Sequence, residues 1–91
     1  MKRKTVRVVN SLGFHARAAA KFVAEASRFD AQITVCLKDK QMDGKSILGL
    51  LLLAAPCGSS LQIQASGPDE KEAVRSLAAL VAAGFGEAPR S

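Results

Sequence analysis

The single histidine of the chain, His15, is the residue best suited to carry chemistry. It stands in the segment Leu-Gly-Phe-His-Ala-Arg at positions 12–17, immediately before a stretch with helical periodicity. Unpaired N–H groups at a helix start bind anions, and a neutral imidazole is a nucleophile. With Arg17 in the first turn, His15 has the groups needed to accept and hold a phosphoryl group. The alternative is a structural role, in which His15 only caps the helix or forms the turn.

Positive charge continues from Arg17 along the same helix through Lys21 and Arg28. This basic stripe beside His15 suits contact with an acidic protein face. Four more basic residues lie within the first seven positions, where nothing in the sequence explains them: Lys2, Arg3, Lys4 and Arg7.

A second helix is predicted from Ser46 to about Ala54. Serine is a favoured N-cap residue, and its loss costs about 1 kcal/mol. So short an amphipathic helix cannot bury the whole run Leu50 to Leu53 on one side, so at least one or two of these leucines should be exposed for contact.

The elements that must position these residues follow two periodicities. Strands are predicted over 5–9, 32–37, 40–43 and 61–66, and helices over 16–27, 46–54 and 69–84, with residues 85–91 frayed. In the second strand, Ile33, Val35 and Leu37 are expected on the buried face and Cys36 on the other. The order β-α-β-β-α-β-α indicates an α+β fold with an antiparallel sheet covered on one face.

Composition excludes several classes of protein. A chain of 91 residues is expected to form one domain, residues 1–91, without a deep cofactor cleft. The net charge of +5 favours an anionic partner, but the lack of Tyr and Trp disfavours nucleic-acid binding. One histidine and two separated cysteines argue against a zinc site or a disulfide framework, so free thiols in the cytoplasm are expected. The longest apolar run, 47–57, is too short to span a membrane.

Two segments together resemble a known family. Residues 12–17, with Ala-Ala-Lys-Phe at 19–22, are similar to the active-site segment of HPr, the histidine phosphocarrier of the phosphoenolpyruvate-dependent phosphotransferase system. Residues 44–50, Gly-Lys-Ser-Ile-Leu-Gly-Leu, resemble the second signature of the same family, and the similarity extends over about residues 5–87. The resemblance implies the HPr-like open-faced β-sandwich, with a four-stranded antiparallel sheet and three helices on one face.

The resemblance also implies roles for individual residues. Phospho-Enzyme I would phosphorylate His15 on Nδ1, and the group would pass to a downstream acceptor of the EIIA type. Arg17 would contact the phosphoryl group, and the amides of Ala16 and Arg17 would line its pocket. An apolar docking surface would consist of Ile47, Leu48, Leu51 and Leu52, with Lys21 and Arg28 as further partner contacts. The protein would be a cytoplasmic, monomeric carrier rather than an independent enzyme, with no cofactor, metal, nucleic acid or membrane partner.

Ser46 matches the serine that HPr kinase/phosphorylase modifies in this family. A phosphate there would add about −1.5 to −2 charge, which would repel an acidic partner face and disturb apolar docking. The ordinary N-cap remains the alternative.

The sequence departs from the family pattern at two positions. Ala18 stands where the family usually has proline, which leaves the transfer rate and local rigidity open but removes no reacting group. Leu12 replaces a polar residue, and together with the Gly-Phe-Gly-Glu segment at 84–87 it favours the nitrogen-related branch.

The sequence is therefore compatible with three functions. The first is phosphoryl transfer through His15. The second is a regulatory binding module whose phosphorylation state selects partners without sugar transport. The third, a small basic RNA-binding protein, is disfavoured by the missing aromatic residues.

Overall fold

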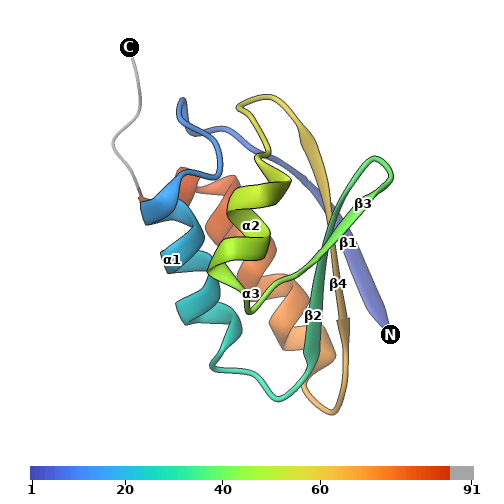
Figure 1. Ribbon diagram of the computed structural model, residues 1–91. Coiled ribbons are helices and arrows are strands. Elements are labelled where there is room, and N and C mark those ends of the chain that lie inside the picture. The colour runs from blue at the N-terminus through green and yellow to red at the C-terminus, as the bar shows by residue number, and fades with distance from the viewer. Residues whose placement is uncertain (87–91) are drawn as a thin grey trace.

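Four strands and three helices follow each other in the predicted order. In the computed structural model, which describes residues 1–86, the elements are β1 (Lys2–Arg7), α1 (Ala16–Ala26), β2 (Gln32–Leu37), β3 (Lys40–Asp43), α2 (Ile47–Leu53), β4 (Ser60–Ser66) and α3 (Glu70–Ala82). A 3₁₀ turn, η1 (Gly84–Gly86), follows α3. All three helices lie on one side of the sheet (Figure 1). The predicted α+β class and element order are confirmed.

The sheet has the strand order β1-β4-β2-β3, and all its pairings are antiparallel. The register aligns Val35 of β2 with Ile63 of β4 and with Met42 of β3. Directly opposed residues share a face of the sheet, so these three side chains point toward the helices. The other face is open to solvent and largely polar.

The core lies between the covered face of the sheet and the helices. Its largest fully buried side chains are Phe22, Phe85, Leu50, Leu53, Leu61, Ile63, Leu77, Val8, Val35 and Val81. Every helix and the strands β2 and β4 contribute to this set, because no single element can bury its apolar face alone.

The first strand begins earlier than predicted, at Lys2 rather than residue 5. The prediction followed the β-branched residues, but an edge strand with one partner and one open side also accommodates charged residues. The regular strand ends at Arg7 because Val8 bonds to two consecutive residues: its N–H donates to the Ser59 carbonyl at 2.9 Å, and its carbonyl accepts from the Gly58 N–H at 2.7 Å.

The predicted fraying after residue 84 is wrong for the part of the tail that the structure describes. Phe85 is only 1% exposed, at a left-handed backbone angle φ of 59°. Burial of its ring stabilises a turn that local sequence rules would leave disordered. Residues 87–91 of the predicted frayed segment lie outside the described residues.

The predicted faces of β2 need one correction. Cys36 is buried although it lies on the open face, while Leu37 is only half-buried. In the register Cys36 has Gln62 on one side and Gln41 on the other, and these longer side chains flank the small thiol.

Candidate functional site

The loop before α1 adopts one shape because Gly13 stands at its tightest point. Gly13 has φ +64°, and a Cβ at this position would lie 2.3 Å from the carbonyl oxygen of Ala55. Asn10 Nδ2 donates to the Gly13 carbonyl at 2.7 Å, and the Phe14 N–H donates to the Ala55 carbonyl at 3.0 Å. The loop is thereby attached to the segment that follows α2.

Phe14 anchors the same loop in the core. Its ring meets Phe22 of α1 edge-on at a centroid distance of 5.5 Å and Phe85 of η1 at 5.2 Å. Lys21 Nζ donates to the Phe85 carbonyl at 2.8 Å. The residue that directly precedes His15 is therefore held by both α1 and the C-terminal turn.

His15 is the N-cap residue of α1. Its backbone is extended (φ −88°, ψ −178°), and its Nδ1 accepts a hydrogen bond from the Arg17 N–H at 3.3 Å. The imidazole is half-buried, whereas Ala16 and Arg17 are exposed. The structural role considered for His15 is thus present, and it directs the lone pair of Nδ1 at the positive end of the helix.

The basic stripe does not converge on His15. Arg17 lies beside it, but Lys21 is committed to Phe85. Arg28 lies beyond the other end of α1, a helix about 17 Å long, and pairs with Glu25 at 2.8 Å. The same Glu25 carboxylate accepts from the Ser76 hydroxyl, which, together with Arg28, lowers the pKa of Glu25. Partner contact by Lys21 and Arg28 stays a prediction.

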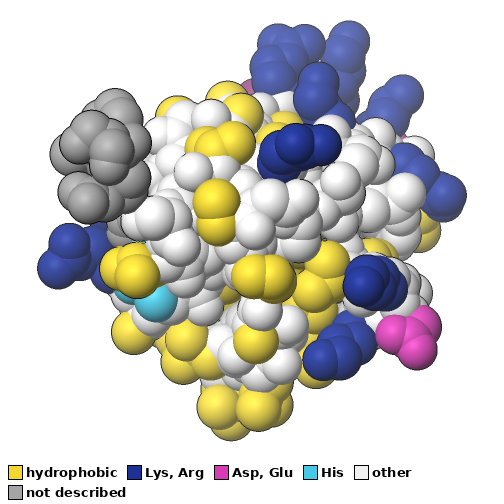
Figure 2. All heavy atoms as spheres, turned by 90° about the horizontal axis from the view of Figure 1, so that it is seen from above, with side chains coloured by type: hydrophobic (Ala, Val, Ile, Leu, Met, Phe, Trp, Pro, Cys, Tyr) yellow, Lys and Arg dark blue, Asp and Glu magenta, His cyan; other side chains and the backbone are white. Residues whose placement is uncertain are grey.

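Helix α2 exposes the apolar residues that the sequence singled out. The exposed fractions are 43% for Ile47, 66% for Leu48, 37% for Leu51 and 61% for Leu52, and these four residues form the α2 apolar surface. Leu50 and Leu53 are fully buried, so two members of the leucine run are exposed, as predicted. In Figure 2 hydrophobic side chains extend outward beside the histidine.

Ser46 is the N-cap of α2, and its Oγ accepts from the Gly49 N–H at 3.0 Å. The loop that holds His15 is bonded to Ala55, just past the other end of α2. The helix rise places Ser46 about 12 Å along the axis from Ala54. Ser46 therefore borders the α2 apolar surface at the end opposite His15.

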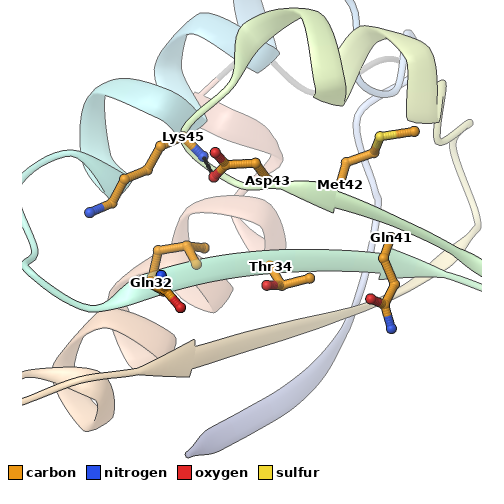
Figure 3. Close-up of a pocket in the computed structure, with 7 residues that line it drawn as sticks. Gln32, Thr34, Gln41, Met42, Asp43 and Lys45 are labelled. Atoms are coloured by element: carbon orange, nitrogen blue, oxygen red, sulfur yellow. Dashed lines mark hydrogen bonds between the residues drawn. The ribbon is translucent and has the colours of Figure 1, made fainter.

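An open depression of about 400 Å³ lies at the β2–β3 side of the sheet (Figure 3). Its charged groups are committed to the fold: the Asp43 carboxylate accepts from the Lys45 N–H at 2.9 Å, and Lys45 Nζ donates to the Phe29 carbonyl at 2.7 Å. The Asp43 and Lys45 side chains in this depression are therefore engaged in bonds within the fold.

Residues 1–86 contain no group of three or more His, Cys, Asp or Glu side chains that could hold a metal ion. No helix among them has both the length and the apolar character needed to cross a membrane.

The geometry of a histidine at a helix start agrees with a comparison to known families. The family model for the phosphorylation site of the HPr component of the phosphotransferase system matches residues 2–83. This chain belongs to the HPr family. The family resemblance expected from the two signature segments is confirmed.

HPr relatives match this chain over nearly its whole length. Phosphocarrier protein HPr of Neisseria meningitidis serogroup A is 41% identical over 87 residues, which cover 96% of this chain and 98% of that protein. Phosphocarrier protein NPr of Shewanella violacea is also 41% identical and covers 93% of both chains. The crystal structure of HPr from Thermoanaerobacter tengcongensis superposes with a TM-score of 0.92 at 41% identity, covering 97% of this chain and 99% of that one. The HPr fold is thus confirmed.

The sequence did not reveal every residue that supports the HPr site. Phe85 and the bond that it receives from Lys21 went unrecognised, because glycines flank Phe85 and obscure its burial. Three of the four phenylalanines form one cluster next to His15. Because the sequence has so few aromatic residues, the expectation that they share one core is the signal that could have placed Phe85 beside Phe14.

Proposed function

We propose that this protein accepts a phosphoryl group on Nδ1 of His15 and passes it to a second protein. The observation that carries the proposal is the position of this nitrogen, which faces the N–H of Arg17 at the start of an eleven-residue helix. A phosphoryl group on Nδ1 would replace the present hydrogen bond and place its oxygens near the same N–H groups.

The transfer conserves atoms and charge. The Nδ1 lone pair attacks the phosphorus, the N–P bond forms, and the bond to the donor atom breaks with its electron pair remaining on the donor. In the second half the acceptor attacks the same phosphorus, and the electron pair of the N–P bond returns to Nδ1. The N–H groups of Ala16 and Arg17 and the Arg17 guanidinium stabilise the phosphoryl oxygens between the two steps.

The donor in this proposal is phospho-Enzyme I, and the acceptor is an EIIA-type component, both in the cytoplasm. The His15 surface is open, so the remaining groups of each transfer centre come from the partner. The α2 apolar surface is exposed next to the His15 loop and supplies area that a partner can bury on docking. Acceptors of the sugar-transport branch and of the nitrogen-related branch both fit this arrangement. In this proposal the protein transfers the group as a monomer.

Incubation with Enzyme I and phosphoenolpyruvate tests this function. We expect acid-labile, base-stable phosphate, detected by intact-mass spectrometry at neutral pH, and its complete loss in His15→Ala. Arg17→Ala keeps the nucleophile and should still be phosphorylated, but more slowly. Label that persists in His15→Ala would contradict the proposal.

We also propose that phosphorylation of Ser46, by HPr kinase/phosphorylase where it is present, regulates docking. The supporting observation is that Ser46 caps α2 directly beside Ile47 and Leu48 of the α2 apolar surface. A phosphate at a helix N-cap is compatible with the helix, so the effect would fall on the partner and not on the fold.

Ser46→Asp and Ser46→Asn separate charge from capping, because both side chains are good N-caps and only one is charged. We expect Ser46→Asp to weaken binding to Enzyme I or the acceptor, measured by calorimetry, and Ser46→Asn to bind like the unmodified protein. Equal affinities for both variants would remove support for regulation through Ser46.

A further inference from the structure

The basic residues near the N-terminus form a second surface, remote from His15. Lys2, Arg3, Lys4 and Arg7 are all exposed and all belong to β1, an outer strand of the sheet. In Figure 2 Lys and Arg side chains gather at a corner of the molecule far from the histidine. We call residues Lys2–Arg7 the β1 edge.

The backbone of the β1 edge is available for hydrogen bonding. The Val8 N–H points toward the β4 side, because it donates to Ser59. Backbone groups alternate in direction along a strand, so those of Val6 and Lys4 also point toward β4, and those of Arg3, Thr5 and Arg7 point outward. Among residues 1–86 no other strand pairs with this outer side of β1.

Positive charge lies on both sides of this row of backbone groups. Lys2 and Lys4 lie on the helix-covered face, since Lys4 is opposite the buried Ile63, while Arg3 and Arg7 lie on the open face. The carboxylate of Glu70, at the Met1 end of this strand, is already engaged: it pairs with the Met1 amino group at 3.1 Å and accepts from the Gly67 N–H.

This alternation selects the shape of the partner. A strand added in the plane of the sheet has side chains on both faces and meets both pairs of charges, whereas a flat membrane meets mainly one face. A second copy of β1 would place like charges opposite each other, which is destabilising. An acidic strand satisfies both the backbone groups and the charges.

We propose that the β1 edge binds an extended acidic peptide segment of another protein, which pairs with β1 as a fifth strand. This surface is separate from the His15 site, so the two can be occupied independently.

A capped peptide, Glu-Val-Thr-Glu-Glu-Glu, provides the probe, because in antiparallel pairing it places glutamate opposite each basic residue of β1. On titration into the ¹⁵N-labelled protein, we expect the amide signals of Arg3, Thr5 and Arg7 to shift. Their hydrogen exchange should slow by about tenfold at saturation, since their N–H groups become bonded. Binding that leaves the exchange of these three amides unchanged would overturn the proposal.

Three variants separate strand addition from simple charge attraction. The double variant Arg3→Glu, Lys4→Glu should bind the peptide about tenfold more weakly or worse, whereas Lys40→Glu on the opposite edge strand, the matched control, should bind normally. Thr5→Pro keeps every charge and the β1–β4 ladder but removes the central outward N–H, so it should also lose binding. Full peptide affinity in Thr5→Pro would overturn the proposal.

Phosphatidylglycerol vesicles and a single-stranded RNA oligonucleotide test the other anionic partners. We expect both to bind more weakly than the peptide and to be insensitive to Thr5→Pro. Tighter binding of either one would overturn the choice of an acidic strand. Phosphorylation of His15 in Thr5→Pro and in the double variant should match the unmodified protein, which shows that each variant is folded and keeps the two proposals distinguishable.

Discussion

At the scale of single residues, the site depends on contacts too short to tolerate substitution. His15 caps α1 through Nδ1, and the loop before it passes so close to Ala55 that position 13 has room for hydrogen alone. The position of His15 Nδ1 and the shape of the loop are therefore set together.

Gly13→Ala tests this constraint. The new Cβ would meet the Ala55 carbonyl oxygen at 2.3 Å and would also impose a positive φ on alanine, so we expect a loss of about 2 kcal/mol or more in the free energy of unfolding. Slower phosphorylation at His15 should accompany it. Urea denaturation and the phosphorylation assay provide the two measurements.

Gly58→Ala is the matched control, because Gly58 also has a positive φ but a Cβ there would have no neighbour within 4 Å. Its free energy of unfolding should fall only by the cost of a positive φ at alanine, about 1 kcal/mol. Equal losses in both variants would show that the contact with Ala55 is unimportant.

The departure at Ala18 is mild at this scale. Ala18 is fully buried in the first turn of α1, where the amide N–H of a helix has no intrahelical acceptor. Proline, which is usual in the family, fits such a position because it lacks this N–H. Alanine fits it as well, and the cap at His15 is present with Ala18 in place.

At the scale of elements, the C-terminal turn η1 supports the start of α1. Phe85 packs on Phe14, and Lys21 of α1 donates to the Phe85 carbonyl. The turn has an unfavourable backbone angle at Phe85, which the burial of its ring offsets.

Phe85→Ala should destabilise the protein by about 3–5 kcal/mol, because it removes a buried ring from a small core. Lys21→Met keeps the alkyl chain and removes one hydrogen bond, so its cost should be about 1 kcal/mol. Urea denaturation measures both values. If Phe85→Ala costs no more than Lys21→Met, the ring does not anchor the loop.

Helix α2 has two distinct sides at this scale. Leu50 and Leu53 complete the core, while the α2 apolar surface faces solvent although its burial would be favourable. Exposure of large side chains on a helix next to His15 is typical of a docking surface.

At the scale of the whole molecule, Asp69 connects the start of α3 to the segment before β2. Its carboxylate, at the N-cap of α3, accepts from the N–H groups of Asp30 and Ala31, each at 2.9 Å, just before β2. The bond from Asp30, with that from Ala31, lowers the pKa of Asp69 below its ordinary value. The ionised form is thus the one that stabilises the fold.

The sign of the pH dependence follows. A carboxyl whose pKa is lower in the folded state stabilises that state above its ordinary pKa of about 4, and this contribution is lost as the pH falls through the folded pKa. Asp69→Asn should therefore be less stable at pH 7 and should lose less stability on further acidification below pH 4. Urea denaturation between about pH 7 and pH 2.5 measures both effects.

Asp39→Asn, in the exposed turn between β2 and β3, is the control and should leave the stability at pH 7 unchanged. A slope in Asp69→Asn as steep as that of the unmodified protein would mean that other carboxylates dominate. Glu25 and Glu70 are the candidates, since hydrogen bonds from Ser76 and from the Gly67 N–H lower their respective pKa values.

The whole molecule also separates two surfaces. The His15 loop and the α2 apolar surface adjoin each other, whereas the β1 edge lies at a remote corner (Figure 2). The positive charge is therefore not confined to the region around His15: four of the thirteen basic residues belong to the β1 edge.

The sequence by itself determined the element order, the α+β class and the residues that begin α1 and α2. Capping and periodicity depend on residues within one or two turns, so His15 and Ser46 could be assigned to helix starts from their immediate neighbours. That at least one or two leucines of α2 must be exposed followed from the short length and amphipathic character of the helix.

Only the tertiary structure decided which distant residues support the site. Lys21 and Phe85 are 64 residues apart, and no local rule predicts their contact or the burial of Phe85 beside Phe14. The strand order β1-β4-β2-β3, which leaves the basic β1 at an edge, likewise depends on pairings between remote segments. The burial of a side chain and the position of a strand in a sheet depend on residues from the whole chain. A helix cap depends only on residues that are neighbours in the sequence.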